Sequence, residues 1–241
     1  MRIQLVQLLK VTDVGTAWIL SNSQKSGVDK KGGGLARSTG SFIDWSLCWD
    51  DIPWLRKHTS LPIVLKGIQS AADAQQAMEA GCQGIVVSNH GGRALDGSPA
   101  TILTLLEIRR DCPEVFDKME VFVDGGVRRG SDVLKAILLG ARGVGVGRPF
   151  QCSVMYDTEG VEHCAGSKLS PFHQDGIITD HGIVLQDELE TAMRLAGITD
   201  LNAVRGDMSW LNTAELMQYL PPQPLTKGTG SWLGSLSRSR L

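Results

Sequence analysis

Four short segments of the 241-residue chain combine glycine with side chains that can carry charge or move a proton. Each segment follows a short apolar run. In order, they contain Lys66; Ser88 with His90; Asp124, Gly125 and Gly126; and Gly147 with Arg148. In parallel α/β proteins, functional residues gather at the carboxyl ends of strands, where the loops converge. The spacing therefore predicts one site built from four strand ends.

The third and fourth of these segments have the chemistry of an anion site. Asp124 opens the sequence DGGVRRG, which includes Val127 and Arg128 and leads into a predicted helix. Its glycines let the backbone approach a ligand, and the free N–H groups of the helix favour an anion. Gly147 and Arg148 add another such glycine and a planar cation. These glycines could instead serve only tight turns, but the repeat at two neighbouring strand ends favours phosphate binding.

The second segment pairs a base with a cation. His90 and Arg93 share the glycine-flanked run HGGR. The guanidinium can hold a carboxylate through two hydrogen bonds while the imidazole reaches a nearby proton. Lys66, on the neighbouring strand, could supply positive charge to a cofactor that gains an electron pair. A single histidine at a strand end is more often structural, so the hypothesis rests on the three residues together.

The elements that must position these residues alternate regularly. Strands are predicted at 61–67, 84–90, 120–126 and 143–147, and helices at 70–81, 101–110 and 131–140, after an amphipathic helix that ends near His58. Short apolar strands alternating with helices of about ten residues are typical of parallel βα units covered on both faces. Beyond Phe150 the period breaks. Weaker helical patterns follow at 154–163, 186–195 and 211–220.

Composition excludes several classes of protein. The net charge of −2 argues against a globally basic nucleic-acid-binding protein, and no apolar run is long enough to cross a membrane. The five cysteines include no C-x-x-C pair, which indicates free thiols in a reducing compartment.

Three motifs carry a close resemblance to a known family. They are LPIVLKG at 61–67, SNHGGRALD at 88–96 and VFVDGGVRRGSDVLKAILLGARGVGVGRPF at 121–150. Together they resemble the FMN-dependent α-hydroxy acid oxidases and dehydrogenases, which include glycolate oxidase, lactate oxidase and the flavin domain of lactate–cytochrome c oxidoreductase. The resemblance runs over residues 41–160 and resumes at 187–220. It implies a partial TIM-type (β/α) barrel that corresponds to strands five to eight of the eight-stranded fold.

The resemblance also implies roles for single residues. His90 would be the active-site base, Arg93 the clamp on the substrate carboxylate, and Lys66 the lysine that stabilises the reduced, anionic flavin. Ser88 would contact the flavin. The FMN ribityl-phosphate site would comprise Asp124, Gly125, Gly126, Val127, Arg128, Gly147 and Arg148. The reaction implied is oxidation of a small L-2-hydroxy acid to the 2-oxo acid, and the base could take either the hydroxyl proton or the α-proton.

The chain departs from the family pattern in two places. Residues 1–40 show no βα pattern, and residues 164–185 look like an irregular insertion between two parts of the 41–220 barrel segment, with a tail at 221–241. The histidines and Cys164 of the insertion lack the short spacing of a zinc site, so no metal is expected. The resemblance assigns the first four strands an aspartate that orients the base and tyrosines that contact substrate, and none is recognisable in this chain. A truncated or alternatively spliced product is one hypothesis for these departures.

Two other functions compete with a hydroxy acid oxidoreductase. One is an inactive half-barrel that binds FMN or phosphate weakly, pairs with another chain or aggregates, whereas full-length relatives would form homo-oligomers. The other is a different phosphate-binding barrel, although such a protein has no reason to carry the HGGR run.

The chain ends in Ser239-Arg240-Leu241, a variant of the peroxisomal S-K-L address. A peroxisomal location is therefore expected, with a cytoplasmic or mitochondrial location as the alternative.

Overall fold

The computed structural model describes residues 47–165 and 184–223. Expectations about residues 1–40, most of the 164–185 insertion and the C-terminal tripeptide lie outside these residues. The chain divides into two compact units, and only residues 47–51 of the first are described, with the 3₁₀ turn η2 (Trp49–Asp51). The second unit, residues 52–232, contains all the elements discussed below.

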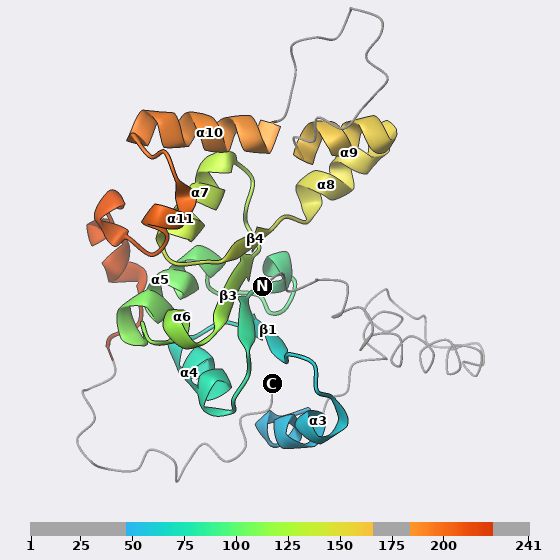
Figure 1. Ribbon diagram of the computed structural model, residues 1–241, viewed down its shortest axis with the longest axis vertical. Coiled ribbons are helices and arrows are strands. Elements are labelled where there is room, and N and C mark those ends of the chain that lie inside the picture. Colours follow the sequence, from blue (N-terminus) through green and yellow to red (C-terminus); the bar gives the residue numbers. More distant parts are fainter. Residues whose placement is uncertain (1–46, 166–183, 224–241) are drawn as a thin grey trace, which may run out of the picture. The chain divides into compact units, whose positions relative to one another are not determined.

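A four-stranded parallel sheet forms the centre of this unit, in the order β1-β2-β3-β4 (Figure 1). Its strands are β1 (Val64–Ile68), β2 (Gly84–Val87), β3 (Glu120–Asp124) and β4 (Gly143–Gly145). Helices α4 (Ala71–Glu79), α5 (Thr101–Asp111), α6 (Val115–Lys118) and α7 (Gly130–Leu138) connect them. The sequential parallel order is that of one part of a (β/α) barrel, as predicted.

The strands are shorter than predicted, and each difference has a local cause. Pro62 has no N–H for the ladder, and the amide of Ile63 donates to the Gln83 side chain (2.9 Å), so β1 begins at Val64. β3 ends at Asp124 because Gly125 and Gly126 adopt φ of +90° and +81°. β2 ends at Val87 rather than at residue 90 because His90 also has a positive φ, +55°.

The helices cover one face of the sheet. Ile85, Val87, Val121 and Val123 alternate along β2 and β3 with exposed fractions of 0–2%, on the face that packs against the helices. Val86 and Phe122, on the opposite face, are half-buried. The expectation of helices on both faces is therefore not met among the described residues, because four strands in an open order cannot close an interior of their own.

Local sequence signals explain most helix boundaries. Ser70 caps α4, since its side chain accepts a hydrogen bond from the Asp73 amide (3.1 Å). The helix α3 (Ile52–His58) ends where predicted and has Pro53 at its second position, where proline is tolerated. The last predicted helix, 211–220, is a 3₁₀ helix, η6 (Ala214–Tyr219).

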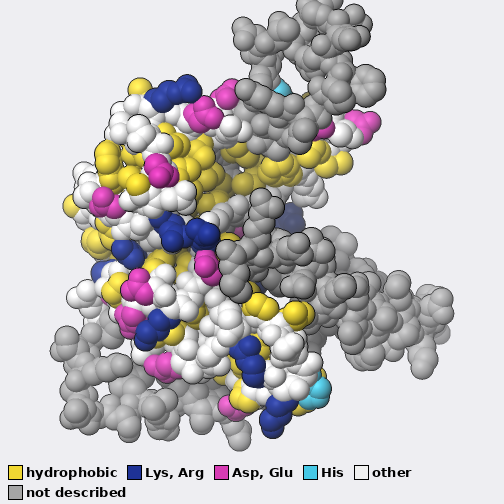
Figure 2. Space-filling view, viewed as in Figure 1, with side chains coloured by type: hydrophobic (Ala, Val, Ile, Leu, Met, Phe, Trp, Pro, Cys, Tyr) yellow, Lys and Arg dark blue, Asp and Glu magenta, His cyan; other side chains and the backbone are white. Residues whose placement is uncertain are grey.

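The segment beyond β4 begins with a helix that the sequence pattern did not predict. This is α8 (Arg148–Ser153), followed by the 3₁₀ turn η4 (Val154–Tyr156) and α9 (Asp157–Ala165). Hydrophobic side chains gather over α8 and α9 in Figure 2, and Val154, Met155 and Tyr156 are 62–84% exposed. An apolar surface of this kind favours association with another molecule.

The helix α10 (Val184–Ala196) packs against α7. Leu134, Leu138 and Ile198 form the buried centre of this contact, with side chains of α10 and α11 (Leu201–Val204) around them. Gly130, the first residue of α7, allows the close approach. A Cβ there would lie 2.6 Å from the Leu185 carbonyl oxygen and closer still to the Leu189 amide. Since Gly130 follows the predicted phosphate loop directly, α10 supports that loop.

Candidate active site

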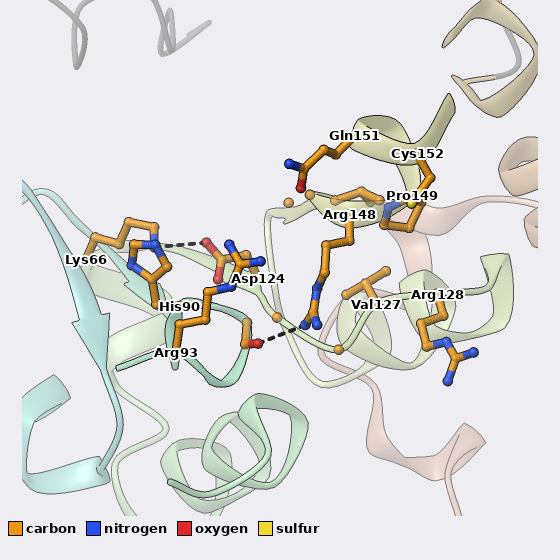
Figure 3. A pocket seen from close by; sticks show the side chains of 16 residues that line it. Lys66, His90, Arg93, Asp124, Val127, Arg128, Arg148, Pro149, Gln151 and Cys152 are labelled. Carbon is orange, nitrogen blue, oxygen red and sulfur yellow. Dashed lines mark hydrogen bonds and ion pairs between the residues drawn. The ribbon is translucent and has the colours of Figure 1, made fainter. Parts of the chain in front are cut away.

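A cavity of about 750 Å³ lies at the carboxyl ends of the four strands (Figure 3). Ten of the eleven predicted site residues line it. They are Lys66, His90, Arg93, Asp124, Gly125, Gly126, Val127, Arg128, Gly147 and Arg148. Ser88, the eleventh, is 1% exposed and lies behind the cavity wall. The fold therefore brings together residues that are up to 82 positions apart in the sequence.

A hydrogen-bonded network connects the ends of β1, β2 and β3. The Lys66 ammonium donates to Ser88 Oγ (3.0 Å) and lies 3.3 Å from Asp124 Oδ2. Ser88 Oγ in turn donates to Asp124 Oδ1 (2.5 Å). The Lys66 side chain is 45% exposed, so this ion pair contributes little stability. The network instead fixes the position of Lys66, because it directs the ammonium group toward the cavity.

The loop after β2 has an uncommon backbone. His90, Gly91 and Gly92 form the 3₁₀ turn η3 (His90–Gly92) with φ of +55°, +63° and +80°. Three consecutive residues in the left-handed region require glycine or external support. The His90 amide donates to Ser88 Oγ (3.1 Å), and the Arg148 guanidinium donates to the Gly91 carbonyl (2.8 Å; Figure 3). This turn places the His90 and Arg93 side chains on the cavity wall.

The anion site differs from its prediction in one respect. Three consecutive amides at the start of α7 are already bonded. Those of Arg128 and Arg129, which precede the helix, donate to Asp132 (3.1 Å each), and that of Gly130 donates to Glu188 (2.8 Å). Glu188 also pairs with the Arg129 guanidinium at 2.7 Å. These carboxylates take the place that we expected an anion to occupy at the N-terminus of α7.

Other donors remain available for an anion. Within the described part of the chain, the amides of Gly126, Val127 and Gly147 donate no hydrogen bond, and all three residues line the cavity. A Cβ at Gly126 or Gly147 would meet no atom within 4 Å, so both face open space. The charged lining comprises Lys66, Arg93, Arg128 and Arg148 against the single carboxylate of Asp124. Free amides and excess cationic side chains fit a phosphorylated cofactor.

Some residues of the site were not predicted. Asn89 and Thr101 brace the loops, and Gln151 and Cys152 of α8 line the cavity. The start of α8 has a signal, since Pro149 follows Gly147 and Arg148, and proline is favoured in a first helical turn. The bond from Thr101 to Gly125 has none, because it depends on which loops become neighbours, whereas the Asn89 bonds lie within its own loop.

The part of the chain that the structure describes does not provide the orienting carboxylate that the resemblance assigns to the base. Among residues 47–165 and 184–223, no ion pair includes His90. The same residues contain no group of three or more His, Cys, Asp or Glu side chains that could hold a metal ion. None of their helices is both long enough and apolar enough to cross a bilayer.

Comparison with known proteins agrees with the motifs. A family model described as FMN-dependent dehydrogenase matches residues 5–211, including residues upstream of the recognisable motifs. The chain belongs to this family. It is 45% identical over 183 residues to L-lactate dehydrogenase (cytochrome) of Saccharomyces cerevisiae, covering 75% of this chain and 28% of that protein. It is 46% identical over 172 residues to mouse 2-hydroxyacid oxidase 1, covering 71% and 41%.

Solved structures place the fold in the same family. A mutant flavocytochrome b2 with pyruvate bound matches with a TM-score of 0.59 at 40% identity, over 82% of this chain and 49% of the other. A mandelate oxidase variant matches with a TM-score of 0.54 at 41% identity, over 66% and 43%. FMN is the cofactor of this family, and the described sheet is part of its barrel. The chain spans less than half the length of these relatives.

Proposed function

We propose that this chain contributes the phosphate site and the His–Arg substrate site of an FMN-dependent enzyme that oxidises a small L-2-hydroxy acid to the 2-oxo acid. One observation supports the proposal most. A single cavity is lined by His90 and Arg93 from the loop after β2 and by the cationic, amide-rich loops after β3 and β4. An acid–base group and a carboxylate clamp thus lie beside an anion site, as a phosphorylated cofactor and an acidic substrate require.

One group of cavity residues would bind the cofactor. The amides of Gly126, Val127 and Gly147, with Arg128 and Arg148, would hold the FMN phosphate. Asp124 would bind the flavin's polar chain, and Ser88, which lies behind the cavity wall, would hold Asp124 and Lys66 in position. Bound FMN would accept the two electrons that leave the substrate.

The substrate side of the site has two residues. The Arg93 guanidinium would bind both oxygens of the substrate carboxylate, which orients the C2 carbon. His90 would hold a proton next to it, taken either from the hydroxyl oxygen or from C2. The substrate class proposed is a small L-2-hydroxy acid of the lactate or glycolate type.

An inactive half-barrel is the alternative function. It is favoured by the half-buried Val86 and Phe122 on the face without helices and by the exposed apolar residues 154–156. Such a protein would pair with a second chain or aggregate. Size-exclusion chromatography tests the pairing, because a soluble monomer argues against association or aggregation. Reduction of bound FMN by a 2-hydroxy acid contradicts the alternative, since an inactive half-barrel can bind FMN but cannot reduce it.

Flavin titration followed by substrate addition tests the leading proposal. Purified full chain is mixed with FMN, and protein-bound flavin absorbance is measured before and after addition of L-lactate, glycolate or mandelate. Bound flavin that bleaches supports the proposal, free flavin contradicts the cofactor role, and bound flavin that does not bleach contradicts the catalytic role. In a chain that turns over, His90→Ala should lower the rate by at least about 10²-fold.

The peroxisomal address at Ser239-Arg240-Leu241 stays part of this proposal. A fluorescent protein fused upstream of the full chain should enter peroxisomes, and removal of the three residues should leave it in the cytoplasm. An unchanged distribution would contradict the address.

A further inference from the structure

We propose that Asn89 is a positioning residue that holds His90 and Arg93 in place, an inference that builds on the proposed function. Asn89 lies between Ser88 and His90 at the end of β2 and does not line the cavity. It therefore does not touch a ligand in the cavity. Its side chain acts on the loop that carries the base and the clamp.

The two ends of the Asn89 amide group bind two separated points of the chain. Oδ1 accepts a hydrogen bond from the Gly92 amide (3.0 Å), which this amide shares with the Asn89 backbone carbonyl (3.0 Å), and Nδ2 donates to the Pro99 carbonyl (3.1 Å). The first bond closes the turn over His90 and Gly91. The second ties the far end of the loop, ten residues later, to the same side chain. Both polar ends of one half-buried group are thus used to close the loop.

The left-handed backbone explains why the loop needs this support. His90 has a φ of +55°, a conformation that a residue with a Cβ adopts only when its surroundings hold it there. Gly91 and Gly92 continue the left-handed path and add no side chain that could stabilise it. The bond from Gly92 to Asn89 therefore keeps the His90 backbone, and with it the imidazole, on the cavity wall.

Asn89 also joins this loop to the loop after β3. A Cβ at Gly125 would lie 2.7 Å from Asn89 Oδ1 and 3.5 Å from the Gly91 amide, so the two loops are in close contact. The Thr101 hydroxyl donates to the Gly125 carbonyl (2.7 Å) from the other side. Since Gly125 begins the predicted phosphate loop, Asn89 sets the distance between the acid–base group and the anion site.

Two substitutions separate the two bonds. Asn89→Ala removes both, whereas Asn89→Asp keeps the acceptor for the Gly92 amide and loses only the donor to Pro99. Asn212→Ala is the matched control, because Asn212 Oδ1 accepts from the Ala214 amide (3.3 Å) in a similar local turn and does not line the cavity.

Hydrogen exchange of the full chain tests the loop without any cofactor. Exchange of amides 90–94 should accelerate about 2- to 10-fold for each bond lost, which is the usual net strength of a neutral hydrogen bond written as a ratio. The order of rates should be Asn89→Ala, then Asn89→Asp, then the parent chain and Asn212→Ala together. The His90 ring resonances, assigned with His90→Gln, should shift in Asn89→Ala and stay unchanged in Asn212→Ala. Unchanged exchange and unchanged resonances would overturn the proposal.

Kinetics of the FMN-loaded chain test the consequence for the reaction. Asn89→Ala should lower kcat roughly 10- to 100-fold, as a misplaced catalytic group does, while FMN affinity stays within a few-fold. Asn89→Asp should recover part of the loss. A loosened loop with unchanged kcat would overturn the positioning role. If the parent chain neither binds flavin nor turns over, the proposed function fails, and exchange and resonances still decide whether Asn89 holds His90.

Discussion

Substitution of Gly130 by alanine tests the support that α10 gives to the phosphate loop. In an unconstrained helix, alanine is about 0.5–1 kcal/mol more stable than glycine, so propensity alone predicts stabilisation. The structure predicts instead that the substitution lowers the stability of the folded chain. The new Cβ would lie 2.6 Å from the Leu185 carbonyl oxygen and closer to the Leu189 amide, both backbone atoms of α10 that cannot rotate away. α10 must therefore shift outward.

The size of the loss follows from what that shift disturbs. Moving α10 loosens the packing of Leu134, Leu138 and Ile198 and lengthens the bond from the Gly130 amide to Glu188. Overpacking of a close contact costs about 1–3 kcal/mol. For a protein of this size, each kcal/mol corresponds to about 2–4 °C, so Tm should fall by about 2–12 °C.

Thermal unfolding followed by circular dichroism at 222 nm measures this change. Lys135→Ala, at an exposed position of the same helix, is the control and should change the free energy of unfolding by no more than about 0.5 kcal/mol. A Gly130→Ala chain with an equal or higher Tm would refute the reasoning, because helix propensity would then outweigh the proposed clash.

Two further predictions concern the cavity and the thiols. Gly147→Ala places a Cβ in open space at the cavity, so Tm should stay unchanged. FMN affinity, measured by flavin fluorescence, should fall. Unchanged affinity would show that Gly147 is not part of the FMN site. Burial raises the pKa of the Cys112 thiol to about 12 and also raises that of Cys82, whereas Cys152 is exposed. Of these three, only Cys152 should react with a thiol reagent at pH 8 before unfolding. The unfolded state loses the Cys112 proton above the ordinary pKa of 9.0, whereas the folded state keeps it up to about pH 12. The contribution of this thiol to the free energy of unfolding is therefore complete below pH 9 and declines as the pH rises toward 12. The fall in Tm between pH 8 and 10.5 should therefore be smaller in Cys112→Ala, and an equal fall would contradict the burial argument.

Periodicity was sufficient to predict the elements of the sheet. The alternation of apolar runs and helical patterns predicted β1 to β4 and the helices α4, α5 and α7, because a strand buried against helices needs a continuous apolar run. Boundaries were less accurate where a side chain or a proline interrupts the ladder, as at Pro62 and His90. The short α8 was not predicted, since its six residues are too few to show a period.

The candidate site was predictable in its residue types but not in its contacts. Lysine, histidine, arginine and glycine at strand ends indicated an anion and acid–base site, because parallel strands bring their carboxyl ends to one edge. The bonding of the α7 amides was not predictable, since Glu188, which binds Gly130, lies 58 residues later in the chain. The same holds for the contact of Arg148 with the Gly91 carbonyl, which spans 57 residues.

The sequence by itself determined which chemistry this protein carries and in which repeating units. The motifs after each strand specify charge, proton transfer and close backbone approach, and these are properties of residue types and short spacings. The tertiary structure decided how the residues meet. Carboxylates bind the amides of Arg129 and Gly130, the amides of Gly126, Val127 and Gly147 stay available for an anion, and Asn89 contacts the loop after β3 at Gly125. The physical reason is that a hydrogen bond depends on distance and angle, which only the packing of distant segments sets.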